Sequence, residues 1–147
     1  MEKLFELTQI QTEDIPMGDT CDGNVLLVPT CGGSFSGEKL NGNLLPVGMG
    51  TAYSRTPGQN DIAASMLLET EDGARIIMEF KAYFDVDAAV EEKMESRELV
   101  DPSEYYYKGT AVFKTDDERY KWLERKICTT ETEILSWEEL VTNVYLV

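Results

Sequence analysis

Three consecutive tyrosines followed by a lysine, Tyr105 to Lys108, are the residues whose types and spacing best suit binding chemistry. Phenol hydroxyls donate and accept hydrogen bonds, and a lysine adds a cation. In a β-strand successive side chains face opposite ways, so Tyr105 and Tyr107 share one face while Tyr106 and Lys108 share the other. The pattern alone favours burial of the Tyr105 face, because Lys108 and Lys114 indicate that the other face is exposed to solvent.

Other aromatic and charged side chains on expected strands could line a binding cavity with this segment. A buried phenol needs a hydrogen-bond partner, and a polar ligand is one way to supply it. Glu79 is the most suggestive carboxylate for acid–base work, because burial would raise its pKa. The alternative is that the rings form the core and that Glu79 is solvated. The ligand-binding candidates are Tyr53, Arg55, Glu79, Tyr83, Tyr106, Lys108 and Trp122, and Tyr105, Tyr107 and Phe113 are further candidates for the lining.

The chain contains no histidine, which is the strongest restriction on its chemistry. Histidine-based general base catalysis, Ser-His-Asp hydrolysis and histidine-rich zinc sites are excluded. The cysteines Cys21, Cys31 and Cys128 show no CxxC spacing, so we interpret them as structural thiols. Acidic clusters at turns do not match the ligand spacing of a calcium loop. We therefore expect no metal site and no cofactor.

The net charge of −15 limits the partners of this 147-residue chain. Such a surface repels nucleic acids and anionic membranes, so we expect neither as a partner. The N-terminus has no apolar run typical of a signal peptide, and we expect no membrane-spanning segment. The length favours a single domain over residues 1–147. We predict a cytoplasmic protein.

Short strands separated by turn residues dominate the chain. The strongest local signal is Asp72-Gly73 between two apolar runs, which predicts a hairpin of residues 61–70 and 74–84. Further strands are expected at 3–10, 25–30, 34–37, 40–45, 49–55, 101–115, 122–130 and 143–147, with a loop at 11–23, a helix at 87–97 and a helical turn at 116–120. This order predicts an all-β fold, either an antiparallel barrel or a sandwich. The glycine-rich middle of the chain favours a single antiparallel β-barrel of about eight to ten strands with one short surface helix.

Several segments in order resemble a family of small uncharacterised bacterial and fungal proteins, the domain of unknown function 3237. They are GGSFSG from Gly32, the Leu45-Pro46 turn with Gly48, TEDGA, DPSEYYYK and FKTDDERYKWLERK. The resemblance implies a β-barrel without implying a known reaction. It matches the family's aromatic pair and following base to Tyr106, Tyr107 and Lys108, which suggests that the Tyr106 face could be the barrel interior.

Two functional hypotheses follow. The first is a barrel that binds a small, partly apolar compound and steers a cofactor-independent isomerase, cyclase or lyase step, with Tyr106 and Lys108 as polar anchors. The second is a non-catalytic homo-oligomeric interaction protein that buries its aromatic face between subunits. A homodimer is expected in either case, because symmetric dimers are common. A barrel interior packed solid with side chains would contradict the first hypothesis.

Overall fold

The computed structural model describes the whole chain, Met1–Val147. The strands are β1 Glu2–Ile10, β2 Ile15–Thr20, β3 Gly23–Pro29, β4 Gly33–Ser36, β5 Gly42–Thr56, β6 Gln59–Thr70, β7 Arg75–Val86, β8 Tyr105–Lys114, β9 Cys128–Ser136 and β10 Glu139–Leu146. The α-helix α1 covers Ala88–Glu95, and two 3-10 turns, η1 and η2, cover Pro102–Glu104 and Lys121–Arg125. No helix is long and apolar enough to cross a membrane.

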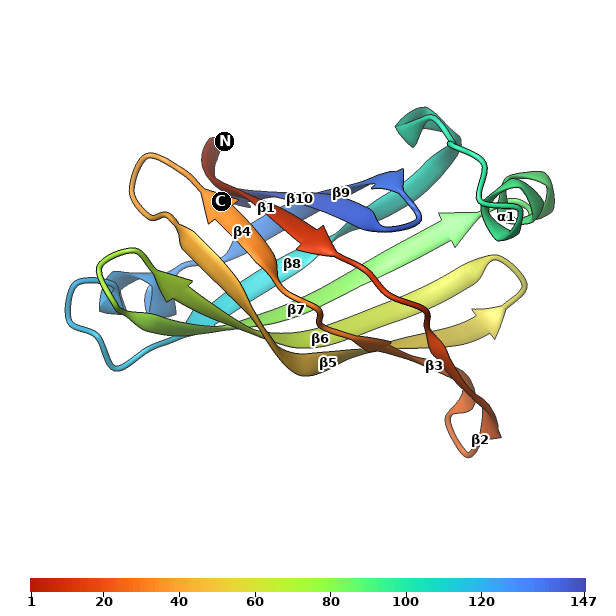
Figure 1. The fold of residues 1–147 in the computed structure, drawn as a ribbon, viewed down its shortest axis with the longest axis horizontal. Helices are drawn as coiled ribbons and strands as arrows, with labels where there is room; N and C mark the ends of the chain where they lie inside the picture. Colours follow the sequence, from red (N-terminus) through yellow and green to blue (C-terminus); the bar gives the residue numbers. More distant parts are fainter.

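Eight of the strands close into an antiparallel barrel, as the sequence predicts. The order β5-β4-β1-β10-β9-β8-β7-β6 returns to its start because β5 also pairs with β6. The second half of β5 pairs with β3 instead of β4, and β3 pairs with β2. The β2–β3 hairpin therefore extends from the barrel beside β5, and α1 lies at the same end of the molecule (Figure 1).

The predicted hairpin and helix are both confirmed. Gly73 adopts a φ of +90° in the turn between β6 and β7, a conformation that glycine reaches without strain. The helix begins where Asp87 caps it, since the Val90 amide donates to the Asp87 carboxylate at 2.8 Å. Local turn and capping chemistry is therefore enough to place these two elements.

Four of the predicted elements differ from the structure. The expected loop contains β2, an exposed strand held only by β3. The two short strands expected at 40–45 and 49–55 are one strand, β5, because a bulge between Leu44 and Gly48 absorbs the irregularity and β6 pairs on both sides of it. The strand expected from Trp122 begins only at Cys128, after η2.

The face of β8 that points inward is the one that carries Tyr105, Tyr107, Ala111 and Phe113. Ala111 and Phe113 are buried, whereas alternate residues along the strand are exposed. A Cβ at Gly109 would collide with the Lys81 carbonyl oxygen of β7, so the missing side chain permits close approach of the neighbouring strand. The simple alternation of the strand therefore gives the correct face.

Candidate functional site

One end of the barrel is hollow. A cavity of about 880 Å³ lies inside it, bounded by β1, β3, β5–β10, the segment after β1 and α1 with the residues that follow. This volume is within the range of small-molecule sites. More than half of the lining residues, 17 of 30, are hydrophobic. The apolar wall consists mainly of Leu26, Val28, Ala52, Ile62, Ala64, Met66, Phe80, Phe84 and Leu140.

The opposite end is packed solid, and the same strands build both ends. On β6, Ala64 lines the cavity and Leu68, four residues later, is fully buried in the core. On β7, Phe84 lines the cavity and Ile76 lies in the core. Met66 belongs to both regions and marks the floor of the cavity. The interior is therefore not filled throughout, so the condition that would have contradicted a ligand-binding barrel is not met.

Two tyrosines on the inner face of β8 have different hydrogen bonding. The Tyr105 hydroxyl accepts a hydrogen bond from the Ile134 amide of β9 at 2.8 Å. Tyr107 lines the cavity and stacks on Phe84, with 4.6 Å between ring centroids, and its hydroxyl has no hydrogen-bond partner in the protein. Burial raises the pKa of both phenols, so Tyr107 is a neutral hydrogen-bonding group facing the cavity.

Further uncharged polar groups lie in the cavity wall. Gln9 of β1 and Thr30, which follows β3, are 8% and 7% exposed, and neither side chain makes a hydrogen bond within the protein. Asn60 of β6 donates its side-chain amide to the Phe84 carbonyl at 3.1 Å, which leaves its side-chain oxygen free. Buried polar groups are normally paired, so these groups can bind a ligand that brings its own partners.

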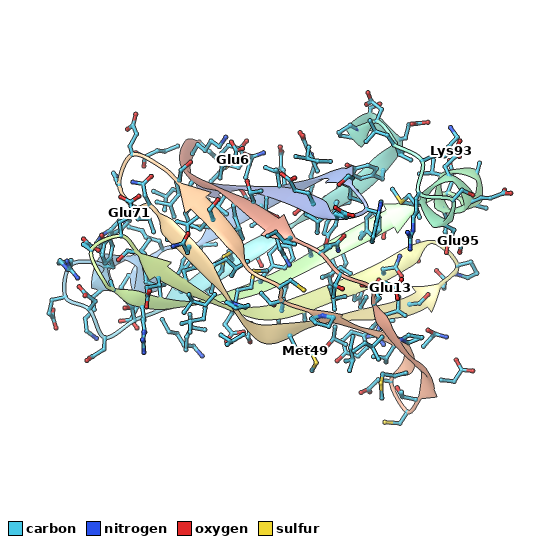
Figure 2. The ribbon with its side chains drawn as sticks, viewed as in Figure 1. Glu6, Glu13, Met49, Glu71, Lys93 and Glu95 are labelled. Carbon is cyan, nitrogen blue, oxygen red and sulfur yellow. The ribbon has the colours of Figure 1, made fainter.

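The mouth of the cavity is acidic. Five carboxyl side chains line it, from the segment after β1 and from α1 with the residues beyond it: Glu13, Asp14, Glu91, Glu95 and Glu98. Figure 2 shows Glu13 and Glu95 at the end of the molecule where α1 lies, and Glu71 at the other end. Arg97 is the one basic residue of the lining. Its guanidinium lies 3.6 Å from Glu13 and 4.0 Å from the centre of the Trp137 ring.

Asp14 is the carboxyl group best suited to proton transfer. Its side chain is exposed at the mouth, and partial desolvation by the surrounding protein raises its pKa above the ordinary value. Its charge is one of the causes that raise the pKa of Tyr107, after burial of the phenol itself, so the two groups interact electrostatically. Histidine, cysteine, aspartate and glutamate side chains nowhere gather in a group of three or more that could hold a metal ion.

None of the seven ligand-binding candidates from the sequence lines the cavity. Tyr83, Tyr106 and Lys108 lie together on the outer face of β7 and β8, where Tyr83 is 62% and Tyr106 50% exposed. Lys108 forms an ion pair with Glu131 at 3.6 Å. The sequence left open which face of β8 is the barrel interior, and the structure shows that it is the alternate set of residues and not the Tyr106 face.

The remaining four candidates are dispersed. Glu79 faces outward and accepts a hydrogen bond from Ser65 at 2.7 Å. Arg55 lies over the Tyr53 ring on the outer side of β5 and forms an ion pair with Asp61. Trp122 is in η2 and packs against the core. Each has a structural partner, so the structure does not bring these residues together as one site.

The residues that do line the cavity include several that the sequence interpretation missed. Gln9, Asp14 and Thr30 lie at or near strand ends, where no local pattern shows which way a side chain points. Arg97 has a φ of +60°, which is uncommon for a residue other than glycine. Its contact with Trp137 joins segments 40 positions apart. Among the residues that the sequence suggested for the lining, only Tyr107 lines the cavity.

Comparisons with known proteins agree with this architecture. A UPF0311 protein of Clostridium acetobutylicum is 32% identical over 123 residues, which cover 83% of this chain and 78% of that protein. The crystal structure of a conserved protein of unknown function from Rhodopseudomonas palustris superposes with a TM-score of 0.92 at 23% identity, over 99% of this chain and 95% of the other. An enzyme from Penicillium herquei superposes with a TM-score of 0.68 at 20% identity, over 97% and 92%. The family model for proteins of unknown function, DUF3237, matches residues 1–147, so the chain belongs to the DUF3237 family.

Proposed function

We propose that the protein binds a small, partly apolar molecule in the barrel cavity. The observation that carries the proposal is an apolar cavity of about 880 Å³ into which Gln9, Thr30 and Tyr107 present polar groups without protein partners. Small-molecule sites typically combine an apolar wall with a few polar groups that orient the ligand. An empty packing defect is typically lined by apolar side chains alone, whereas this cavity also has polar groups in its wall.

A matched pair of variants tests the proposal. Ala64 of β6 lines the cavity, and its neighbour Ala63 faces the opposite side of the strand, opposite Lys81 of β7. Ala64→Phe should fill part of the cavity and lower the affinity for the neutral fluorophore N-phenylnaphthylamine at least about tenfold, or about 1.4 kcal/mol. Ala63→Phe should bind the fluorophore as the wild type does. Thermal melts of both variants would show whether the fold is intact.

The outcome that contradicts the proposal is equally specific. A folded wild-type protein that does not bind the neutral fluorophore, or two variants that both bind it with wild-type affinity, would mean that the cavity is not a binding site. Equal loss in both variants would place the effect in the barrel as a whole.

A catalytic function is the second candidate, and the presence of Asp14 and Tyr107 in the lining of one cavity favours it. A carboxylate whose pKa is raised by partial desolvation can take a proton from carbon next to a carbonyl group, while a neutral phenol stabilises the enolate oxygen by donating a hydrogen bond. An isomerisation, a cyclisation or a lyase step can begin in this way without a cofactor. The fold is shared with a protein described as an enzyme, which is compatible with this chemistry.

Hydrogen exchange on a simple ketone tests the catalytic function. The protein should accelerate exchange of the hydrogens next to the carbonyl of tetralone in deuterated water, followed by proton NMR. Asp14→Asn should abolish the acceleration, whereas Glu13→Gln, one residue earlier in the same exposed segment, should retain it. If the wild type and Asp14→Asn accelerate the exchange equally, Asp14 is not the catalytic base.

A further inference from the structure

Gln9 and Thr30 form a polar patch in the cavity wall that the protein itself does not satisfy. Both side chains are more than nine-tenths buried, line the cavity and lack a hydrogen-bond partner. Gln9 pairs with Gly33 of β4, and Thr30 lies three residues before that glycine in the chain. Their polar atoms stay accessible from the cavity, so they can pair with a ligand that enters it.

Tyr107 and Asn60 supply polar groups on a different part of the wall. Along the barrel, three strand-to-strand steps separate β1, which carries Gln9, from β8, which carries Tyr107, and three also separate it from β6, which carries Asn60. In a ring of eight strands these positions lie across the interior from β1. Apolar residues such as Phe80 and Met66 line the space between them. The cavity therefore offers uncharged polar groups on two sides and an apolar middle.

Charge in the cavity is confined to the mouth, and there it is mainly negative. Arg97 is the only basic residue of the lining, and its guanidinium is already engaged by Glu13 and by the Trp137 ring. An anionic ligand would pass five carboxyl side chains and find no free cation inside. Removing an anion from water without a paired charge is unfavourable, and the acidic mouth adds repulsion that salt can screen.

We propose that the ligand of this cavity is uncharged and carries hydrogen-bonding groups, such as hydroxyls or ketone carbonyls, at both ends of an apolar framework. One end pairs with Gln9 and Thr30, and the other end pairs with Tyr107 and Asn60. Carboxylates, sulfonates and phosphates are excluded. This inference rests on the proposed binding function and specifies the chemical class of the ligand.

Two fluorophores that differ by one sulfonate group test the exclusion of anions. N-phenylnaphthylamine is neutral, and anilinonaphthalenesulfonate is the same ring system with a negative charge. At low salt the neutral probe should bind at least about tenfold more tightly. Added salt should reduce this difference in affinity between the two probes. The double variant Glu95→Gln and Glu98→Gln should reduce it as well. Equal affinities for the two probes at low salt would overturn the inference.

A second measurement tests the polar patch. Dihydroxynaphthalene with its hydroxyls at opposite ends has the proposed arrangement of groups. Gln9→Leu combined with Thr30→Val should weaken binding of this probe at least about threefold, which corresponds to one neutral hydrogen bond. This loss should exceed any change in the affinity of the same variant for N-phenylnaphthylamine, which has no hydroxyl group. Thr110→Val, on the exposed face of β8, serves as the control.

The two levels of the proposal fail in different ways. If neither neutral probe binds the folded wild-type protein, the proposed binding function is wrong. If both bind but the sulfonate probe binds equally well, or if the polar-patch variant binds dihydroxynaphthalene unchanged, the cavity is a binding site and only the ligand class is wrong.

Discussion

Tyr105 and Tyr107 allow a direct test of whether an unpartnered hydroxyl in the cavity serves a ligand. The two residues share the inner face of β8, and burial raises the pKa of both. Only Tyr105 has a protein partner, the Ile134 amide at 2.8 Å. Tyrosine to phenylalanine removes the hydroxyl and keeps the ring, so each change isolates one hydrogen-bonding group.

Tyr105→Phe should lower the stability of the fold, and Tyr107→Phe should lower the affinity for a ligand. Tyr105→Phe leaves the Ile134 amide unpaired and should cost about 1–3 kcal/mol of unfolding free energy. For a chain of this size each kcal/mol lowers the melting temperature by about 2–4 °C. Tyr107→Phe breaks no protein hydrogen bond and keeps the stacking on Phe84, so the melting temperature should be unchanged or slightly higher. Its affinity for dihydroxynaphthalene should fall about 2- to 13-fold, since a neutral hydrogen bond contributes about 0.5–1.5 kcal/mol.

Thermal melts by circular dichroism and fluorescence titrations measure both quantities on the same samples. Tyr105→Phe should bind the probe with wild-type affinity at a temperature where it is folded. The reasoning is refuted if Tyr107→Phe is destabilised as much as Tyr105→Phe and binds the probe unchanged, because the Tyr107 hydroxyl would then be a structural group.

Three further substitutions test residues outside the cavity. Hydrogen bonds from the Thr70 and Tyr120 hydroxyls lower the pKa of Asp72, so its carboxylate stabilises the fold above pH 3.8 and this contribution is lost as the pH falls further. The melting temperature of Asp72→Asn should therefore lie below that of the wild type at pH 7, and the difference between the two melting temperatures should disappear in acid. Thr142→Val leaves the buried Thr132 hydroxyl unpaired and should cost about 1–3 kcal/mol in chemical denaturation, whereas unchanged stability would argue against the 2.9 Å hydrogen bond between them. We predict a homodimer contact at the outer face of β8, so Tyr106→Ala should lower the sedimentation coefficient without changing probe affinity; a monomeric wild type would rule this out.

Local sequence signals predicted those parts of the fold that depend on few residues. The turn at Gly73 and the cap at Asp87 are examples, because each is determined by chemistry within about four positions. The bulge between Leu44 and Gly48 could not be predicted in this way. A proline and a glycine in this stretch suggested a strand end, but β6 pairs with β5 on both sides of the bulge and holds it as one strand. Pairing between segments distant in sequence therefore overrides the local signal.

The candidate site was less predictable than the fold for a related reason. Alternation along β8 correctly places Tyr107 inside, whereas the family resemblance drew the prediction to Tyr106 and Lys108, which lie outside. The mouth depends on a contact between Arg97 and Trp137, which follow α1 and β9. These segments meet only when the barrel closes, so no spacing in the sequence reports their proximity.

The hollow end of the barrel results from side-chain size at a few inward positions. Gly50, Ala52 and Ala64 line the cavity where β5 pairs with β6, while Leu44 and Leu68 are paired across the same two strands in the packed end. Backbone pairing continues through both ends, so exchanging small residues for large ones would close the cavity without changing the fold. A shared barrel therefore does not imply a shared ligand. Under the proposed binding function, the size and polarity of the residues at these inward positions would decide which molecule this barrel holds.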